Sequence, residues 1–118
     1  MTNIDPKQML PLTPAVFHIL LALADRERHG YGIMQEVSES TKGEVRMGPG
    51  TLYGTIKRMI AAELVEESDE RPDPELDDER RRYYRLTDFG HRVACAEAER
   101  LASLVDLAQA KRLLGGLA

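Results

Sequence analysis

The sequence of 118 residues contains no tryptophan and a single cysteine, Cys95. One cysteine cannot form a disulfide within the chain, and its isolation fits a reducing compartment. The three histidines, His18, His29 and His91, lie far apart in the sequence and do not show the spacing of metal ligands. We therefore expect no disulfide, no metal site and no cofactor.

Long hydrophobic runs are absent as well. The longest, near residues 19–24, is far too short to cross a bilayer. Residues 1–7 lack the basic region and the following apolar stretch of a signal peptide. These absences predict a soluble, cytoplasmic protein that does not associate with a membrane.

Signatures of catalysis are also missing. Residues 48–51, Gly-Pro-Gly-Thr, resemble the start of a phosphate-binding loop but have neither its full spacing nor its lysine. The chain has no nucleophile elbow and no dinucleotide-binding fingerprint. We expect no catalytic residues and no enzyme activity.

The charges that are present are distributed unevenly. Hydrophobic residues make up 42% of the chain and charged residues 31%, which is typical of one globular domain. The net charge of −4 and the pI of about 5.4 argue, as totals, against nucleic acid. However, residues 46–62 carry three cations and no acid, residues 80–85 carry four arginines, and residues 66–79 carry nine acids and one arginine. The acidity is thus concentrated between two basic segments. For nucleic-acid binding, this distribution of charge matters more than the net charge.

The N-terminal part predicts an arm followed by a helix. Two prolines discourage regular structure in residues 1–11, which we expect to form a mobile arm. Thr13 is suited to an N-cap with Pro14 at the first helical position, so a helix should run to about Ala24. This helix is apolar nearly all the way round and must be covered by other helices or by a second subunit.

A second helix should follow a polar turn at residues 25–29. We expect it to run from Gly30 to about Thr41, with Gly43 as its C-terminal stop. Residues 44–47 favour a short strand, because apolar and polar residues alternate there.

The next segment, residues 48–64, has the pattern of a DNA-reading helix. Leu52, Ile56, Met59 and Ile60 have the spacing of one apolar helix face. The opposite face has only small residues, a hydroxyl and cations, namely Gly50, Thr51, Gly54, Lys57, Arg58 and Ala61. Such a face suits the major groove, because bulky side chains would hold the helix away from base edges and acids would repel phosphates. The alternative is an ordinary amphipathic surface helix.

Two β-rich segments, residues 65–68 and 82–86, predict an antiparallel hairpin around an exposed loop at residues 69–80. Alternation along the second strand turns Tyr84 toward the core and Tyr83 outward.

The last predicted helix runs from Asp88 to about Leu114, with Thr87 as its cap. At about 27 residues it would be roughly 40 Å long, too long for the rest of the chain to cover. Its apolar stripe contains Ala94, Ala98, Leu101, Leu104, Val105, Leu107 and Ala108. We expect part of this stripe to meet a second copy of the chain, the alternative being that the helix folds back on its own domain.

The order of these elements predicts a mainly α fold with a small β-hairpin. In this plan a winged helix-turn-helix DNA-binding domain occupies residues 12–87, and a long C-terminal dimerisation helix occupies residues 88–116.

Short motifs occur in a fixed order along the chain. They are Leu20-Leu21-Ala22-Leu23, His29-Gly30-Tyr31-Gly32-Ile33, Gly50-Thr51-Leu52-Tyr53, Arg58-Met59 and Arg82-Tyr83-Tyr84-Arg85-Leu86-Thr87-Asp88-Phe89-Gly90. Together they resemble the PadR family of bacterial transcriptional regulators, and the resemblance covers about residues 12–114. It implies a homodimer that binds double-stranded operator DNA, usually as a repressor, and that dimerises through its C-terminal helices. Some members release DNA when a phenolic or drug-like ligand binds. The chain departs from the family pattern in its longer, acidic wing loop and in having no tryptophan to stack on such a ligand.

The residues expected to face DNA are Thr51, Tyr53, Gly54, Thr55, Lys57, Arg58, Arg80, Arg81 and Arg82. The residues expected in the dimer interface are Val16, Phe17, Leu20, Ala98, Leu101, Leu104, Val105 and Ala108. A small-molecule effector would bind in the gap between the subunits.

Alternatives stay open for three of these expectations. Tyr53 either contacts the phosphate backbone or simply packs, whereas Tyr31 is expected to pack between helices. The arginine run at residues 80–82 either holds phosphates or neutralises the neighbouring acids. For the whole protein, the alternative is a winged-helix protein-interaction module without DNA binding, which the acidic pI permits.

Overall fold

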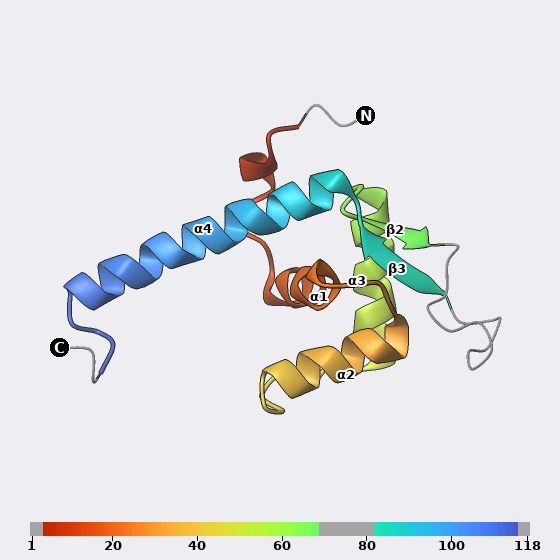
Figure 1. Cartoon of the computed structure of the whole chain (residues 1–118), viewed down its shortest axis with the longest axis horizontal. Helices are drawn as coiled ribbons and strands as arrows, with labels where there is room; N and C mark the ends of the chain where they lie inside the picture. Colours follow the sequence, from red (N-terminus) through yellow and green to blue (C-terminus); the bar gives the residue numbers. More distant parts are fainter. Residues whose placement is uncertain (1–3, 69–81, 116–118) are drawn as a thin grey trace.

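The computed structural model describes residues 4–68 and 82–115 of the chain. Its elements, shown in Figure 1, are η1 (Pro6–Met9), α1 (Pro14–Ala24), β1 (Arg28–His29), α2 (Gly30–Ser40), α3 (Pro49–Ala61), β2 (Val65–Ser68), β3 (Tyr83–Leu86) and α4 (Asp88–Ala110). No helix among these residues is long and apolar enough to cross a membrane.

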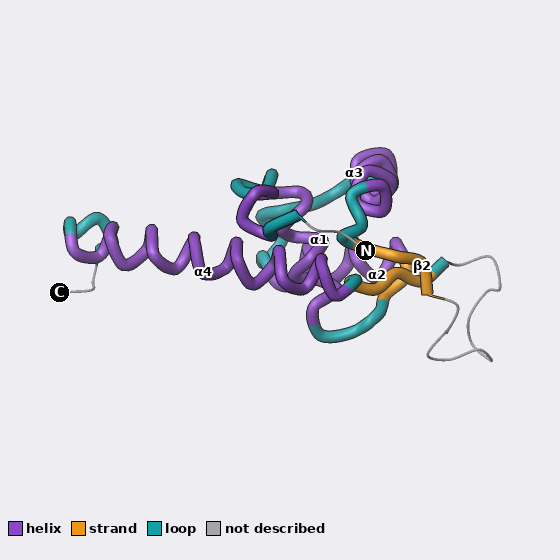
Figure 2. The backbone as a smooth tube through the Cα atoms, turned by 90° about the horizontal axis from the view of Figure 1, so that it is seen from above, coloured by secondary structure: helices purple, strands orange, loops and turns teal. Residues whose placement is uncertain are grey.

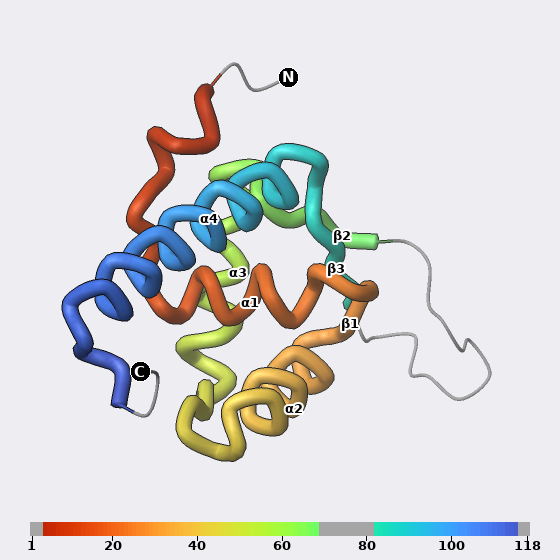
Figure 3. The backbone as a smooth tube through the Cα atoms, turned by 60° about the vertical axis from the view of Figure 1, so that its left-hand side comes forward, coloured from red at the N-terminus to blue at the C-terminus, as the bar shows by residue number. Residues whose placement is uncertain are grey.

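Helix α1 is the centre of the fold. Thr13 caps it as predicted, since its Oγ1 accepts a hydrogen bond from the Val16 amide at 3.3 Å, and proline takes the first helical position. The helix contacts α2, α3, α4 and β3, and Figure 3 shows it running between α2 and α4. Leu20 is 0% exposed inside this core. The prediction that Leu20 lies in a dimer interface is therefore wrong, because its own chain already covers it.

The sheet has three strands in the order β1-β3-β2, and both pairings are antiparallel. The predicted hairpin is confirmed, with Val65 opposite Leu86. Strand β1, which pairs Arg28 with Tyr84 along the other edge of β3, was not predicted. A strand was predicted at residues 44–47, where the structure has none.

The missed strand and the wrongly predicted strand have a common physical reason. The backbone of β1 finds an open edge of β3, which lies more than 50 residues away in sequence. In contrast, Val45 donates its amide to Thr41 Oγ1 at 3.0 Å, and Val45 and Met47 use only their side chains to pack against the core. Alternating polarity does not by itself distinguish these two arrangements.

Tyr83 was predicted to point outward, and this is wrong. Tyr84 is in the core as expected, but Tyr83 is also buried, with 8% exposure. The ring of His29 in β1 meets Tyr83 edge to face, with the ring centroids 5.2 Å apart. The additional strand thus covers a side chain that a two-stranded wing would leave in water.

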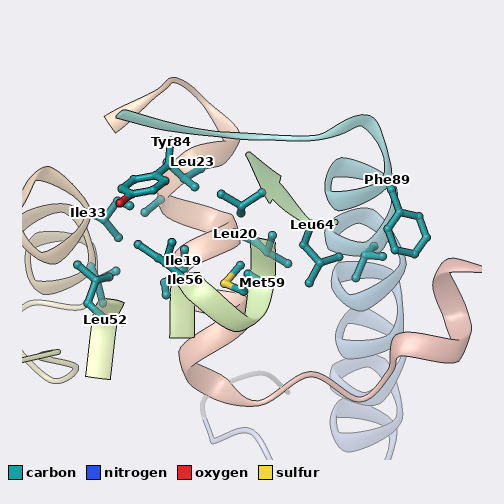
Figure 4. Packing of buried hydrophobic residues seen from close by; sticks show 14 residues of the cluster. Ile19, Leu20, Leu23, Ile33, Leu52, Ile56, Met59, Leu64, Tyr84 and Phe89 are labelled. Carbon is teal, nitrogen blue, oxygen red and sulfur yellow. The ribbon is translucent and has the colours of Figure 1, made fainter. Parts of the chain in front are cut away.

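The apolar face of α3 packs into the core that Figure 4 shows. Leu52, Ile56 and Met59 are 0–2% exposed, whereas Ile60, at the margin of this face, is 37% exposed. The buried face is the predicted one except at Ile60. Burial of this face fixes which side of α3 remains outside.

The first turns of α4 belong to the same body. Thr87 caps the helix, since its Oγ1 accepts from the Gly90 amide at 2.9 Å. Phe89 and Val93 are buried, and the α-carbon of Gly90 lies against the Leu64 carbonyl group so closely that a side chain there would overlap it. The C-terminal helix is therefore not a separate unit at its start.

The helix ends differ in detail from the prediction. Helix α2 stops at Ser40, and the left-handed residues that follow are Lys42 (φ 54°) and Gly43 (φ 79°). The Gly43 amide closes the turn by donating to the Ser38 carbonyl at 2.7 Å. Helix α4 stops at Ala110 rather than near residue 114, because Arg112 also takes a left-handed conformation (φ 62°).

Residues 4–11, expected to form part of a mobile arm, instead lie along α4. Pro6 begins the short helix η1, and Met9 and Leu10 pack against the core. The Leu12 amide donates to Glu97 Oε2 of α4 at 2.8 Å. Proline at the first position of a helix costs no hydrogen bond, so two prolines did not prevent order here. Residues 1–3 lie outside the described residues.

The second half of α4 projects from the body, as Figures 1 and 2 show. The helix has 23 residues, which corresponds to about 35 Å. Beyond Arg100 its apolar side chains are largely open to solvent: Leu104 is 50% exposed, Val105 46% and Leu107 52%. The chain thus leaves an apolar stripe without a cover among the described residues.

Candidate nucleic-acid interface

The outer face of α3 is the strongest candidate for contact with nucleic acid. Pro49 starts the helix after Gly48, and no acid occurs anywhere in it. The exposed residues of the helix are Pro49, Gly50, Thr51, Tyr53, Lys57, Arg58, Ile60 and Ala61, and Gly54 is partly exposed. The outward face therefore combines small residues with two cations, as its spacing predicts.

Thr55 does not lie on this face, in contrast to the prediction. Its side chain is 1% exposed, next to the buried side of the helix. Its hydroxyl donates to the Thr51 carbonyl at 2.6 Å and accepts a hydrogen bond from Arg58 Nη2 at 3.2 Å. The helical wheel places Thr55 nearer to Met59 than to Gly54, and tertiary packing then covers it.

Tyr53 connects α3 to the start of α2. Its ring lies over Gly30, where a methyl carbon would be 2.6 Å from Cζ. Gly30 follows His29, which caps α2 by accepting the Gly32 amide on Nδ1 at 3.0 Å. Tyr53 is nevertheless 48% exposed, so it packs against α2 and also faces outward.

Tyr31 was expected to pack between helices, and this is wrong. It is 54% exposed and stacks on the ring of His29, with centroids 6.4 Å apart. Tyr31 is two residues before the buried Ile33, which at about 100° per residue places it on the opposite face of α2. Tyr31 therefore faces solvent at the start of α2.

Of the arginine run in the wing, the structure describes Arg82 alone, since Arg80 and Arg81 lie outside the described residues. The Arg82 Nη1 atom lies 2.9 Å from Glu67 Oε1 across the hairpin. The hydrogen bond and the charge of Glu67 raise the pKa of Arg82. Because this ion pair is exposed, it contributes little to stability. Replacing Glu67 by a phosphate as the partner of Arg82 would therefore cost little free energy.

One cation near α3 was not included among the predicted site residues. Arg46 is exposed in the connection between α2 and α3, and its guanidinium lies over Gly43, with Nη2 3.3 Å from the position of a β-carbon there. The sequence could have indicated Arg46 as a site residue, because it begins the acid-free segment 46–62. The neighbouring Glu44 is also exposed and reduces the local positive charge.

Helices α1, α2 and α3 with the β2–β3 hairpin and this outward face define a winged helix-turn-helix domain. Residues 19–96 match the family model described as "Transcriptional regulator PadR-like family". The chain belongs to this family, whose members are DNA-binding transcriptional regulators and not enzymes.

The chain is also similar in sequence to two known proteins. The chain is 40% identical over 99 residues to "Transcriptional regulator Rv3488" of Mycobacterium tuberculosis, an alignment that covers 84% of this chain and 81% of that protein. It is 37% identical over 86 residues to an uncharacterized 37.1 kDa protein in transposon TN4556 of Streptomyces fradiae, covering 73% of this chain but 22% of that protein. The chain thus spans about a fifth of the length of the transposon protein.

The fold is similar to the crystal structure of a PadR family transcription regulator from hypervirulent Clostridium difficile R20291. The TM-score is 0.70 at 23% identity, and the match covers 82% of this chain and 96% of that one.

Proposed function

We propose that the protein is a homodimeric repressor that places α3 in the major groove of its operator. The observation that carries this proposal is the outer face of α3, which holds Lys57 and Arg58 and no acid in a chain whose net charge is −4. A surface that contacts a phosphate-lined groove should carry cations and no acids, because carboxylates would be repelled by the phosphates.

The contacts follow from the exposure of each side chain. Lys57 and Arg58 supply the positive charge, and Thr51 offers a hydroxyl close to the N-terminus of α3. Gly54 has no side chain to hold the helix away from base edges. Tyr53, already held against α2, presents its exposed part to the phosphate backbone. The arginine run at residues 80–82 binds phosphate beside the helix.

The projecting half of α4 supplies the dimer interface in this proposal. Ala98, Leu101, Leu104, Val105 and Ala108 share one side of the helix, and all five are exposed or half-buried there. Covering one large aliphatic side chain stabilises association by roughly 1.5–3 kcal/mol. A twofold dimer would present two copies of α3 to half-sites about one helical turn of DNA apart.

A small-molecule effector would bind between the subunits. Val16 and Phe17 of α1 are half-buried and keep part of their apolar surface outside their own chain. Together with Leu101 and Val105 of α4 they would line the space where two copies meet. A flat apolar ligand there would change the angle between subunits, and with it the spacing of the two α3 helices, so that the repressor leaves its operator.

The first experiment selects a DNA duplex from a randomised pool with the wild-type protein and measures binding by gel shift. Light scattering on the same preparation should give the mass of a dimer. Placing the selected duplex between a promoter and a reporter tests the direction of regulation, and we expect reporter expression to fall. A protein that enriches no duplex would instead favour the interaction module, and a rise in expression would overturn the repressor assignment.

The effector is tested on the same complex. Phenolic and larger aromatic compounds are added to the protein bound to the selected duplex, and release of DNA is followed by fluorescence anisotropy. We expect Phe17→Ala to weaken the effect of an active compound without weakening DNA binding. A solved dimer whose interface is fully packed, with no cavity near Phe17, would contradict this part of the proposal.

A further inference from the structure

Residues on successive turns of α3 are joined by a short chain of hydrogen bonds. Arg58 Nη2 donates to Thr55 Oγ1 at 3.2 Å, and the Thr55 hydroxyl donates to the Thr51 carbonyl at 2.6 Å. Thr55 is 1% exposed, whereas Arg58 is exposed. A hydroxyl on the buried flank of the helix therefore anchors a cation on the outward face.

Two hydrogen bonds, one donated and one accepted, fix the orientation of the Thr55 hydroxyl. A threonine hydroxyl has one proton to donate and lone pairs to accept with. Because the proton is given to the Thr51 carbonyl, the remaining lone pairs can only accept, and one of them meets Arg58. The burial of Thr55 holds its side chain in place. Arg58 thus meets an acceptor that is already oriented.

Arg58 lies back along the helix toward its N-terminus. Its Nη1 atom is 3.8 Å from the point where a β-carbon on Gly54 would be, so the guanidinium lies over Gly54. This is the direction that long side chains favour on a helix. Within residues 4–68 and 82–115 no carboxylate pairs with Arg58. Its other N–H groups therefore remain available on the outward face of α3.

Lys57 provides the contrast. It is exposed, and among the described residues it makes no hydrogen bond and no ion pair. A lysine of this kind acts as a flexible point charge, which a phosphate accepts at many angles, whereas a guanidinium offers donors in a fixed planar arrangement. The two adjacent cations of α3 are thus prepared for different tasks.

We propose that Thr55 is a positioning residue of the DNA-reading surface: it holds the guanidinium of Arg58 over Gly54 so that Arg58 reads a guanine edge, while Lys57 holds a phosphate. Arginine donating to O6 and N7 of guanine is a specific major-groove contact. An arginine that is already ordered loses less conformational freedom on binding. This inference rests on the proposed function, in which α3 enters the groove, and it makes specificity depend on a residue that DNA does not touch.

The test compares Thr55→Val, which keeps the shape and removes the hydroxyl, with Thr55→Ser, which keeps the hydroxyl. The probes are the duplex selected by the wild-type protein and a scrambled duplex of the same composition, titrated at several salt concentrations. We expect Thr55→Val to weaken binding to the selected duplex by about 2- to 13-fold for each subunit, the equivalent of ordering one long side chain. Binding to the scrambled duplex and the salt slope should not change, because no charge is lost. Thr55→Ser should bind like the wild-type protein.

A double-mutant cycle separates positioning from a general effect on the helix. If Thr55 acts through Arg58, Thr55→Val should weaken binding no further in an Arg58→Ala background. Repeating the selection with Thr55→Val should give a weaker preference for guanine at one position of each half-site. Thr55→Ala, which removes the same acceptor without placing a methyl group in its stead, provides the same comparison if the valine variant does not fold.

Several results would overturn the inference. They are equal losses with and without the Arg58 side chain, equal losses on both duplexes, and binding of Thr55→Val that matches the wild-type protein. Failure of the proposed function is seen differently: Lys57→Ala and Arg58→Ala would then both bind the selected duplex like the wild-type protein, which would remove α3 from the interface altogether.

Discussion

The ring of Tyr53 on α3 lies directly against the α-carbon of Gly30 at the start of α2. A methyl carbon on Gly30 would be 2.6 Å from Cζ and 2.8 Å from Cε1 of that ring, well inside van der Waals contact. The two motifs His29-Gly30-Tyr31 and Gly50-Thr51-Leu52-Tyr53 therefore meet in space, and the approach of α2 to α3 depends on a position without a side chain.

We expect Gly30→Ala to separate these helices or displace the ring. Overpacking of this kind costs roughly 1–3 kcal/mol, which urea denaturation would measure, and DNA binding should weaken as well. Gly32→Ala is the matched control, because a β-carbon there lies 3.5 Å or more from its neighbours and should be tolerated. The variant Tyr53→Ala should remove most of the penalty of Gly30→Ala. If the penalty persists without the ring, the contact is not its cause.

Two neighbouring residues of α3 should separate folding from binding. Ile56 is 2% exposed, so Ile56→Ala should cost roughly 2–5 kcal/mol of stability through the cavity it leaves. Lys57→Ala should leave stability nearly unchanged but reduce the slope of log affinity against log salt by about 0.9 for each phosphate that is no longer neutralised in each subunit. Denaturant titration and salt-dependent gel shifts measure the two effects. An unchanged salt slope would show that Lys57 does not touch a phosphate.

Replacing Leu104 with aspartate should convert the proposed dimer to a monomer. The side chain is 50% exposed on the projecting half of α4, and a charge there would have to be buried between subunits without a partner. Leu113→Asp is the control, because Leu113 is more exposed, at 73%, and lies beyond the end of the helix. Sedimentation and light scattering at micromolar concentration give the mass. The interface must lie elsewhere if both variants stay dimeric.

Glu97 should make part of the stability depend on pH. The hydrogen bond from Arg100 lowers the pKa of Glu97 and the Leu12 amide lowers it further, while burial opposes them. The folded chain therefore binds this proton less readily than the unfolded chain. The stabilisation is present above about pH 4.3, the ordinary value for glutamate, and is lost as the pH falls through the lower folded pKa.

The comparison for Glu97 is Glu97→Gln, which does not ionise but can still accept the Leu12 amide. Between about pH 5 and pH 3, an interval around the ordinary glutamate pKa, the unfolding free energy of the wild-type protein should fall more steeply than that of the variant. Hydrogen exchange at the Leu12 amide should report when residues 4–11 leave α4. Parallel stability curves for the two proteins would show that Glu97 carries no such linkage.

Much of the fold could be predicted because its signals are local. Thr13 with Pro14, and Thr87, indicate helix starts by capping chemistry that acts within one turn. The spacing of Leu52, Ile56 and Met59 identifies the buried side of α3, and therefore the acid-free side as well. The family resemblance depends on these same short motifs.

The errors in the candidate site have a different origin. Thr55 is a polar residue at the margin of an apolar face, and only neighbouring elements decide whether such a margin is covered. Leu20 was expected to meet a second subunit because its helix is apolar all round, but α2, α3, α4 and β3 already surround that helix. Tyr83 was expected in water because the strand that brings His29 over it was not anticipated.

The sequence by itself determined where α1, α2 and α4 start, which side of α3 is free of acids, and that the last helix is too long for the rest of the chain to cover. Tertiary structure alone decided that β1 completes the sheet, that residues 4–11 lie on α4 beside Glu97, and that a buried threonine holds Arg58. The physical reason is range. Capping and helical periodicity involve residues within two helical turns of each other, so both can be recognised in the sequence. Burial and strand pairing depend on contacts between residues that are distant in the sequence, and these contacts are known only from the folded chain.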